Sequence, residues 1–384
     1  MYISYFSISG YRSLKDVKIN AMLRVCIFHG LNNSGKSNIL SALETIFCRK
    51  VLVEETTVGG VTKHERKANF WQGRISQFRD NFYCNEKQDI VFSVSITFTH
   101  EELAFLMDVL KNLHAPLAKP GHKKVLTLSG RIKYVDEDTA DMVLERAVFN
   151  EHHVLFEVDK DGKKSFFPKL PKLTAEEKLA YFEELMNMLA DSFTLLSSNR
   201  YLTAEGALEE SKEELSLSPK NFKKWLFKLA LSRQGHATFE EIKAMFKDEP
   251  FSIGEIGFSR DRDEIEIMVQ GPRVRLPIGR LGSGHQQILY IIANLVLNKR
   301  KMLGIEELEI NLSPTAQKIL FEKLKHHIYK SSDLASQILI TSHSDYFSGR
   351  QDVRCYGVEH NGDYTVVKPW TQATKAGFFS RASS

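Results

Sequence analysis

The segment from Gly30 to Ser37 constrains the fold of this chain more than any other feature, because it fills every fixed position of the pattern G-x-x-x-x-G-K-[ST]. The apolar run from Val25 to Phe28 precedes it and predicts a buried strand. Residues 38–48 follow with apolar side chains at helical spacing. A loop between a strand and a helix N-terminus presents backbone N–H groups to phosphate oxygens. The sequence therefore predicts an α/β fold with a nucleotide phosphate site.

Two side chains of this loop have specific expected roles. We expect Lys36 to reach the β- and γ-phosphates and Ser37 to bind Mg²⁺. The other positions expected to contact the nucleotide are Gly30, Asn32, Asn33, Ser34, Gly35 and Asn38. An ordinary glycine-rich turn is the alternative interpretation, but it does not account for the strand and the helix on either side.

Composition excludes several classes of protein without naming a function. With 384 residues and 42% hydrophobic content, the chain is long enough for one or two domains with a full core. A net charge of +4 is too small to indicate nucleic-acid binding by itself. The longest apolar span, residues 288–297, is about half the ~20 residues of a membrane helix, and the N-terminus lacks a signal-peptide pattern. We therefore expect a cytoplasmic protein that is not inserted in a membrane.

Cysteine spacing supports the same expectation. The four cysteines lie far apart in the sequence and form no metal-ligand pattern: Cys26, Cys48, Cys84 and Cys355. Reduced thiols in a cytosolic protein fit this spacing best.

The secondary structure predicted from the sequence changes in type twice along the chain. Strand patterns occupy residues 2–9, 14–20, 23–28 and 89–99, whereas residues 51–88 read as irregular. From Glu101 to about Asp248 helical patterns dominate, and residues 174–193 open with the capping box Thr174-Ala-Glu-Glu177. From Phe251 onward strands and helices alternate again. We expect an N-terminal lobe over residues 1–100, a mainly helical insertion over 101–250, and a C-terminal lobe over 251–384.

Three segments of the C-terminal lobe carry further chemistry. Leu281-Gly-Ser-Gly-His-Gln-Gln287 resembles the signature loop of ABC-type ATPases, in which Ser283 and Gly284 would bind a γ-phosphate presented by another subunit. A plain helix cap is the alternative for this loop. Ile338-Leu-Ile-Thr-Ser-His-Ser-Asp345 resembles the switch segment of the same proteins, in which His343 would hydrogen-bond the γ-phosphate. A structural histidine is the alternative there.

The third segment runs from Lys301 to Pro314 and resembles the Walker B segment of RecF-like and overcoming-lysogenization-defect ATPases. By position, Glu306 is the carboxylate on the Mg²⁺ side and Glu307 the general base for the attacking water. The segment departs from the family pattern, because Leu308 replaces the usual proline and Ser313 the usual histidine. A cluster of acidic residues at a solvated strand end is the alternative interpretation.

Two residues are assigned on weaker patterns. Leu195-Leu-Ser-Ser-Asn-Arg-Tyr201 resembles a strand-then-arginine segment of this group, which places Arg200 near the nucleotide or the dimer seam. A surface ion pair is the alternative for Arg200. The glutamine of the Q-loop, a further metal-side residue, is assigned to Gln77, although Gln72 and Gln88 satisfy the spacing equally well.

Together these motifs identify the chain as resembling the ABC-class AAA ATPases of the RecF/SMC/overcoming-lysogenization-defect group. It is most similar to compact antiphage-defence ATPases of the Septu and PARIS type. The resemblance implies an ABC-type P-loop ATPase head, a mixed sheet flanked by helices, that binds ATP and Mg²⁺, hydrolyses ATP slowly, and forms a head-to-head homodimer or higher oligomer. It also implies a separate effector chain, a nuclease or toxin. After the switch segment, residues 344–384 are too few for the TOPRIM nuclease domain of related proteins.

Two other functions stay open at this level. Basic residues at 119–133 and at 273–280 would suit DNA or RNA phosphates, as in a RecF-like repair ATPase that clamps DNA. Acidic stretches such as Glu209 to Glu214 interleave with them, however, and surface lysines commonly serve solubility. A nucleotide-binding structural subunit with negligible turnover is the third interpretation, because Glu306 and Leu308 depart from the usual motif.

Overall fold

The computed structural model describes most of the chain in several stretches: residues 1–47, 54–58, 61–65, 72–76, 79–83, 88–99, 101–103, 124–135, 139–168, 173–190, 192–198, 200, 202, 219, 221–247, 253–261, 264–271, 273–330, 335–347 and 352–371. The chain divides into two compact units. The first consists of Met1–Thr194 and Phe347–Ser384, and the second is Leu195–Tyr346. This division differs from the expected lobes, because the chain of the first unit returns after the second unit is complete.

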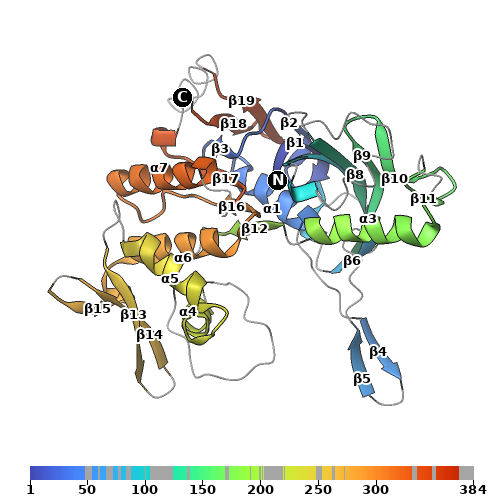
Figure 1. Ribbon diagram of the computed structural model, residues 1–384. Coiled ribbons are helices and arrows are strands. Elements are labelled where there is room, and N and C mark those ends of the chain that lie inside the picture. Colours follow the sequence, from blue (N-terminus) through green and yellow to red (C-terminus); the bar gives the residue numbers. More distant parts are fainter. Residues whose placement is uncertain are drawn as a thin grey trace. The chain divides into compact units, whose positions relative to one another are not determined.

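A largely antiparallel sheet forms most of the first unit (Figure 1). Its strand order is β11-β10-β9-β8-β7-β1-β2, and β6 also pairs with β9. The strands are β1 (Tyr2–Tyr11), β2 (Leu14–Ile19), β6 (Gln72–Ser76), β7 (Ile90–Phe98), β8 (Lys124–Tyr134), β9 (Thr139–Phe149), β10 (His153–Val158) and β11 (Lys164–Phe166). Short 3₁₀ turns occur at Arg79–Asn81 and Glu101–Leu103. Core side chains alternate along β8, where Leu126, Leu128 and Ile132 are buried.

The expectation of a mainly helical insertion over residues 101–250 is wrong for residues 124–166, which form four strands of this sheet. Alternation is legible in β8 but interrupted in β9. Ser129 lies opposite Arg146 and Gly130 opposite Leu144, so Glu145 is an extra residue in β9. Such a β-bulge shifts the alternation of buried and exposed residues by one position, so the sequence pattern no longer predicts a strand there. The helices predicted for this region lie in both units, so it is not one domain.

Residues 51–88 were expected to be irregular, and this expectation is also wrong. β4 (Glu54–Val58) and β5 (Val61–Glu65) pair antiparallel, with Val58 opposite Val61. Two short runs rich in threonine and valine around Gly59-Gly60 are a hairpin signal in the sequence. β6 follows them and joins β9.

The phosphate-loop helix and a second set of strands complete the first unit. α1 (Lys36–Phe47) buries one apolar face, and the Tyr11 hydroxyl at the end of β1 lies 3.0 Å from Ser41 Oγ on this helix. β3 (Val25–His29) pairs parallel with β18 (Arg354–His360), which pairs antiparallel with β19 (Thr365–Pro369). β18 and β19 form a hairpin that turns through Asn361 and Gly362, with His360 opposite Thr365. β3 is buried along its whole length, as its apolar sequence predicts.

The capping box predicted from the sequence is present at the start of α3 (Ala175–Leu189). Thr174 Oγ1 accepts from the Glu177 N–H, and Glu177 Oε2 accepts from the Thr174 N–H at 2.8 Å. The buried face of the helix carries Phe182, Leu185, Met186 and Leu189. Leu179 lies at helical spacing from these residues, yet it is 41% exposed.

The second unit contains the elements of the predicted C-terminal lobe up to Tyr346 and two helices of the expected insertion (Figure 1). β18 and β19, which were expected in the same lobe, belong to the first unit. β16 (Met302–Ile305) pairs parallel with β17 (Gln337–Ser342). β13 (Glu255–Asp261), β14 (Glu264–Gln270) and β15 (Arg275–Pro277) form an antiparallel sheet. The helices are α4 (Phe222–Leu231), α5 (His236–Lys247), α6 (Ser283–Leu297) and α7 (Pro314–Lys330), with 3₁₀ turns at Ile278–Arg280 and Asp345–Phe347. β12 (Phe193–Leu196) lies at the junction of the units.

Helix packing in the second unit follows from its apolar side chains. The Phe258 ring of β13 lies 5.2 Å from that of Phe227 on α4 and 5.5 Å from that of Phe239 on α5, so both helices cover the small sheet. α6 is buried from Gln286 to Val296, which makes it the central helix of the unit. In the described part of the chain, no helix combines the length and the apolar character needed to cross a membrane.

Candidate nucleotide-binding site

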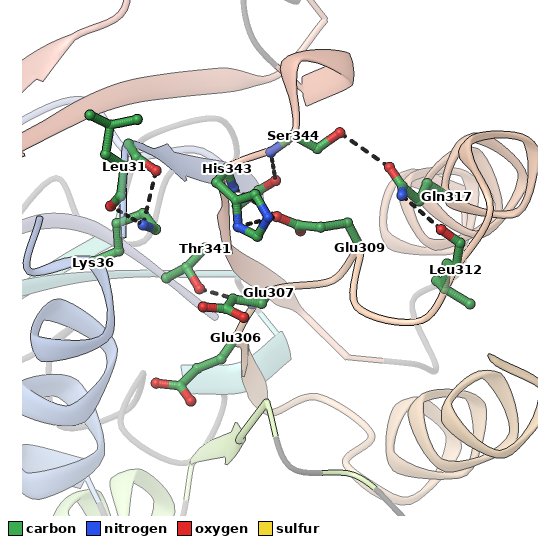
Figure 2. Close-up of polar contacts among 12 residues, drawn as sticks. Leu31, Lys36, Glu306, Glu307, Glu309, Leu312, Gln317, Thr341, His343 and Ser344 are labelled. Atoms are coloured by element: carbon green, nitrogen blue, oxygen red, sulfur yellow. Dashed lines mark hydrogen bonds and ion pairs between the residues drawn. The ribbon is translucent and has the colours of Figure 1, made fainter. Parts of the chain in front are cut away.

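The loop predicted to bind phosphate connects β3 to α1 in the first unit, as the sequence indicated. Lys36 is 5% exposed, and its Nζ donates to the backbone carbonyls of Gly30 at 2.9 Å and Leu31 at 2.7 Å (Figure 2). These contacts hold the ammonium group within the curve of the loop. Ser37 and Asn32 are exposed at the surface of the same loop.

The close packing of the loop backbone explains why glycines occupy positions 30 and 35. Gly35 has φ +96°, and a Cβ there would collide with Thr365 Oγ1 and lie 2.9 Å from Ser13 Oγ. At Gly30, a Cβ would collide with the carbonyl oxygen of Val358. Ser34 Oγ is buried and has no hydrogen-bond partner among the described residues. A backbone curled this closely, with a lysine inside it, fits phosphate oxygens.

Residues far away in sequence support the loop, and the sequence did not indicate them. The Thr365 hydroxyl donates to the Ser34 carbonyl at 3.0 Å, and Ser13 Oγ lies 2.7 Å from Thr365 Oγ1. Asn38 Nδ2 donates to Ser13 Oγ at 2.8 Å, and its Oδ1 accepts from Arg12 Nη1 at 3.4 Å. Arg12 and Ser13 follow the end of a strand and match no motif, so only their contacts reveal them.

The predicted acidic residues lie in the second unit, directly after β16. Glu306 Oε2 accepts from the Ser198 N–H at 3.2 Å. Glu307 has φ +45°, a left-handed conformation that costs a non-glycine residue on the order of 1–2 kcal/mol. Its N–H donates to Thr341 Oγ1 at 3.0 Å, which helps to hold this turn (Figure 2). Backbone strain of this kind concentrates at functional sites.

The departures from the family pattern have structural explanations. Leu308, in place of the usual proline, is fully buried and contributes to the core. Ser313, in place of the usual histidine, caps α7, because its Oγ accepts from the Ala316 N–H at 3.2 Å. Pro314 follows as the first helical residue, a position whose N–H has no partner within the helix, so the missing N–H of proline loses no helical hydrogen bond.

Arg200 is buried, with 0% exposure, so the alternative of a surface ion pair is wrong. Its Nη1 donates to the carbonyls of Ser197 at 2.7 Å and Glu306 at 2.6 Å, and its Nη2 to the carbonyl of Glu307 at 3.0 Å. Burial lowers the pKa of the Arg200 guanidinium to about 10, with Glu306 opposing the shift, so the group stays charged at neutral pH. These contacts hold the backbone of the acidic turn, and its predicted contact with nucleotide stays a prediction.

We expect Arg200→Ala to destabilise the second unit strongly. The truncation leaves the carbonyls of Ser197, Glu306 and Glu307 without this donor, and each lost hydrogen bond to a charged group costs roughly 1.5–3 kcal/mol. Thermal unfolding should show a lower Tm than for the control Arg280→Ala, which removes an exposed arginine. Equal Tm values for the two variants would contradict this role.

His343 lies at the end of β17 in the second unit. Its backbone N–H and its Nδ1 both contact Glu309 Oε1, at 2.7 Å and 3.1 Å (Figure 2). The His343 side chain is 45% exposed, whereas that of Glu309 is 6% exposed. The ring is thus anchored on one nitrogen by a buried carboxylate. Of the residues predicted for the site, the structure brings Arg200, Glu306, Glu307 and His343 together through their contacts with the acidic turn and β17.

The predicted signature loop forms the beginning of α6. Gly282 precedes the helix with φ +97°, and no side chain caps the first turn. A Cβ at Gly284 would lie 2.8 Å from the carbonyl oxygen of Asn311, so only a glycine allows this close approach of α6 to the turn before α7. Ser283 is the first residue of α6, where unpaired N–H groups favour an anion.

Gln77, assigned to the Q-loop, lies outside the described residues. Of its alternatives, Gln72 belongs to β6 and Gln88 is exposed before β7. The basic cluster at 119–133 is also only partly described. Arg131 donates to Glu145 at 2.5 Å and to Asp89 at 3.4 Å, so carboxylates already engage its charge. Lys124 is buried. Of the described residues of this cluster, Lys133 is exposed and is the one whose charge remains available to nucleic-acid phosphates.

A family model described as an AAA ATPase domain matches residues 1–103 and 80–347, a span that includes the phosphate loop, the acidic turn and His343. The chain belongs to the AAA ATPase domain family. The match extends over both compact units, so this ATPase domain is made from both. A search of curated proteins found no significant match.

Solved structures show the fold of the domain. The SMC head bound to the C-terminal winged-helix domain of ScpA is 12% identical, with a TM-score of 0.51 over 98% of this chain and 100% of that one. A second structure is the SMC head with an extended coiled coil, bound to the C-terminal domain of ScpA, from Pyrococcus furiosus. It is 12% identical, with a TM-score of 0.49 over 100% of each chain. The SMC head from Thermotoga maritima is 12% identical, with a TM-score of 0.46 over 96% of this chain and 99% of that one. The match at a TM-score of 0.51 shows that the ATPase domain has an SMC-head-like α/β fold, with mixed sheets flanked by helices.

Proposed function

We propose that this AAA ATPase domain binds and hydrolyses ATP, and that hydrolysis controls a separate effector protein. The observation that carries the proposal is the phosphate loop, in which a buried lysine lies inside a tightly curled backbone at the N-terminus of α1. Loop amides would bind the phosphate oxygens, and Lys36 would supply a positive charge to the β- and γ-phosphates. Oxygen ligands suit Mg²⁺, and Ser37, Glu306 and Gln77 are the residues proposed to hold it, where it would neutralise phosphate charge.

In the proposed reaction, Glu307 acts as the general base. Its carboxylate accepts a proton from water while the water oxygen bonds to the γ-phosphorus. The bond to the β–γ bridging oxygen breaks, and ADP and phosphate leave. The fixed turn at Glu307 supports this role, because Thr341 and Arg200 hold its backbone. His343 is proposed to contact the γ-phosphate through its exposed ring.

We further propose that two copies of the domain form a dimer around ATP. The uncapped first turn of α6, beginning at Ser283, supports this arrangement, since it would bind the γ-phosphate held by the other copy. The signature loop would then complete the partner's site and not its own. A symmetric dimer built in this way contains two composite sites.

A mixing experiment tests the composite site. Lys36→Ala and Ser283→Arg are each expected to be inactive alone, because every site in either homodimer lacks one half. In a heterodimer, the intact loop of the Ser283→Arg chain meets the intact signature of the Lys36→Ala chain. Random 1:1 mixing should therefore restore about a quarter of wild-type ATP hydrolysis. Absence of recovery, or wild-type turnover by either variant alone, would leave a nucleotide-binding domain without a shared site.

The role in antiphage defence rests on the sequence resemblance to compact defence ATPases. Solved SMC heads bound to ScpA support the idea that a head of this fold docks a separate protein. A gene for an HNH nuclease, reverse transcriptase or toxin beside the gene of this chain would identify the effector. A DNA clamp is less well supported, because Arg131 is engaged by carboxylates and Arg275 donates to the Phe258 carbonyl.

A further inference from the structure

Glu309 is a buried carboxylate that the proposed reaction does not use. Its Oε1 receives both the backbone N–H of His343, at 2.7 Å, and the His343 Nδ1, at 3.1 Å (Figure 2). Its Oε2 is buried and has no hydrogen-bond partner in the described part of the chain. A buried charge in such surroundings needs compensation, and the histidine is the positively ionisable group in contact with it.

The contact determines which nitrogen of His343 is left for a ligand. A carboxylate only accepts hydrogen bonds, so the proton of the ring lies on Nδ1. Nε2 is then the ring nitrogen that can hydrogen-bond a ligand. Because phosphate oxygens are also acceptors, Nε2 can bond one only when it carries a proton as well. Glu309 accepts from Nδ1 on the opposite side of the ring and so leaves Nε2 for the phosphate oxygen.

Other contacts fix the backbone around this pair. Ser344 Oγ donates to Gln317 Oε1 at 3.1 Å, and Gln317 Nε2 donates to the Leu312 carbonyl at 2.9 Å. Thr341 accepts the Glu307 N–H. The end of β17 is thus tied to the acidic turn and to α7 independently of the imidazole. Glu309 contacts the His343 ring directly, so removing the Glu309 carboxylate should change the orientation of the ring more than the path of the backbone.

We propose that Glu309 is a positioning residue that holds His343 with Nδ1 protonated and Nε2 directed to the γ-phosphate. The inference rests on the proposed ATPase function. Glu309 acts through His343, and not as a second base, since its more exposed neighbour Glu307 already fills that role. The device makes the site respond to the presence of a γ-phosphate, because ADP offers no partner to Nε2.

Two variants distinguish the effect of Glu309 on the orientation of the His343 ring from the effect of its negative charge. Glu309→Leu removes both the acceptor and the charge, whereas Glu309→Gln retains an acceptor oxygen without the charge. In nucleotide-free protein labelled with ¹⁵N-histidine, His343 should show a proton on Nδ1 in the wild type and in Glu309→Gln. In Glu309→Leu it should shift toward the Nε2-protonated form. The His343→Gln variant identifies the signal. The control is Glu322→Gln, which removes a half-exposed carboxylate on α7 that pairs with Lys325 and not with His343.

Nucleotide binding gives the second readout. Affinity for a non-hydrolysable ATP analogue should fall about tenfold in both Glu309 variants, because one charge-assisted contact weakens, while affinity for ADP stays unchanged. Combining Glu309→Leu with His343→Gln should cost no more than His343→Gln alone, since the two residues act as one unit. If the leucine variant does not fold, Glu309→Gln preserves the side-chain size and still tests the charge.

The outcomes distinguish this inference from the proposed function. An unchanged His343 signal in Glu309→Leu, equal losses for ADP and the analogue, or additive losses in the double variant would each overturn the role of Glu309. If Lys36→Ala hydrolyses ATP normally, the proposed function fails, yet the histidine signal of nucleotide-free protein still reports on the pair.

Discussion

Lys36→Ala is expected to abolish ATP hydrolysis and to weaken ATP binding by about ten- to a hundredfold, the effect of losing one or two charge-assisted contacts. The lysine is the positive charge inside the loop, held by the carbonyls of Gly30 and Leu31. Alanine leaves the backbone amides in place but removes the partner of the β- and γ-phosphates. Isothermal titration with ATP and a phosphate-release assay measure the two effects.

A matched control for this variant lies in the same unit. Lys18 is on β2 with its side chain 63% exposed, so Lys18→Ala removes the same charge from the surface. It should bind and hydrolyse ATP as the wild type does. Undiminished turnover by Lys36→Ala would remove the basis of the proposed function.

Glu307→Gln is expected to retain ATP binding and to lose hydrolysis by about a hundred- to ten-thousandfold, the usual contribution of a general base. The amide has the shape of the carboxylate but cannot accept the proton of the attacking water. The backbone contacts to Thr341 and Arg200 do not depend on the side chain, so the turn should keep its conformation. Bound ATP should therefore persist, and the dimer should become more stable in its presence.

Single-turnover kinetics and size-exclusion chromatography with ATP measure these two effects. Glu183→Gln, which neutralises an exposed glutamate on α3, should behave as the wild type in both assays. Near-normal hydrolysis by Glu307→Gln would transfer the base role to Glu306 or Glu309 and show that the acidic segment is assigned out of register.

The local architecture of the site could be predicted because its signals are local in the chain. A buried strand, a glycine-rich loop with lysine, and an amphipathic helix follow one another within residues 25–47, and the structure has them in that order. The same holds for the Thr174 capping box, where both partners lie within one helical turn. The family match over residues 1–103 and 80–347 agrees with the ATPase interpretation of the motifs.

Pairings between distant segments required the tertiary structure. Of the strands missed between β8 and β11, β9 carries a bulge at Glu145 that interrupts the alternation on which a strand prediction depends. Ser13 is linked to the phosphate loop through Thr365, over three hundred residues away in the sequence, whose hydroxyl donates to the Ser34 carbonyl.

The sequence by itself determined the motif residues, and it predicted the kind of chemistry that they serve, since residue type and spacing carry that information. Only the tertiary structure decided how these residues are held. It showed that Arg200 supports the acidic turn through backbone carbonyls, which have no sequence signature. It also showed that Glu309 contacts His343, a pairing fixed by two neighbouring parallel strands that end side by side. Hydrogen bonds to the backbone and pairings across a sheet depend on the folded path of the chain, and a linear pattern does not contain them.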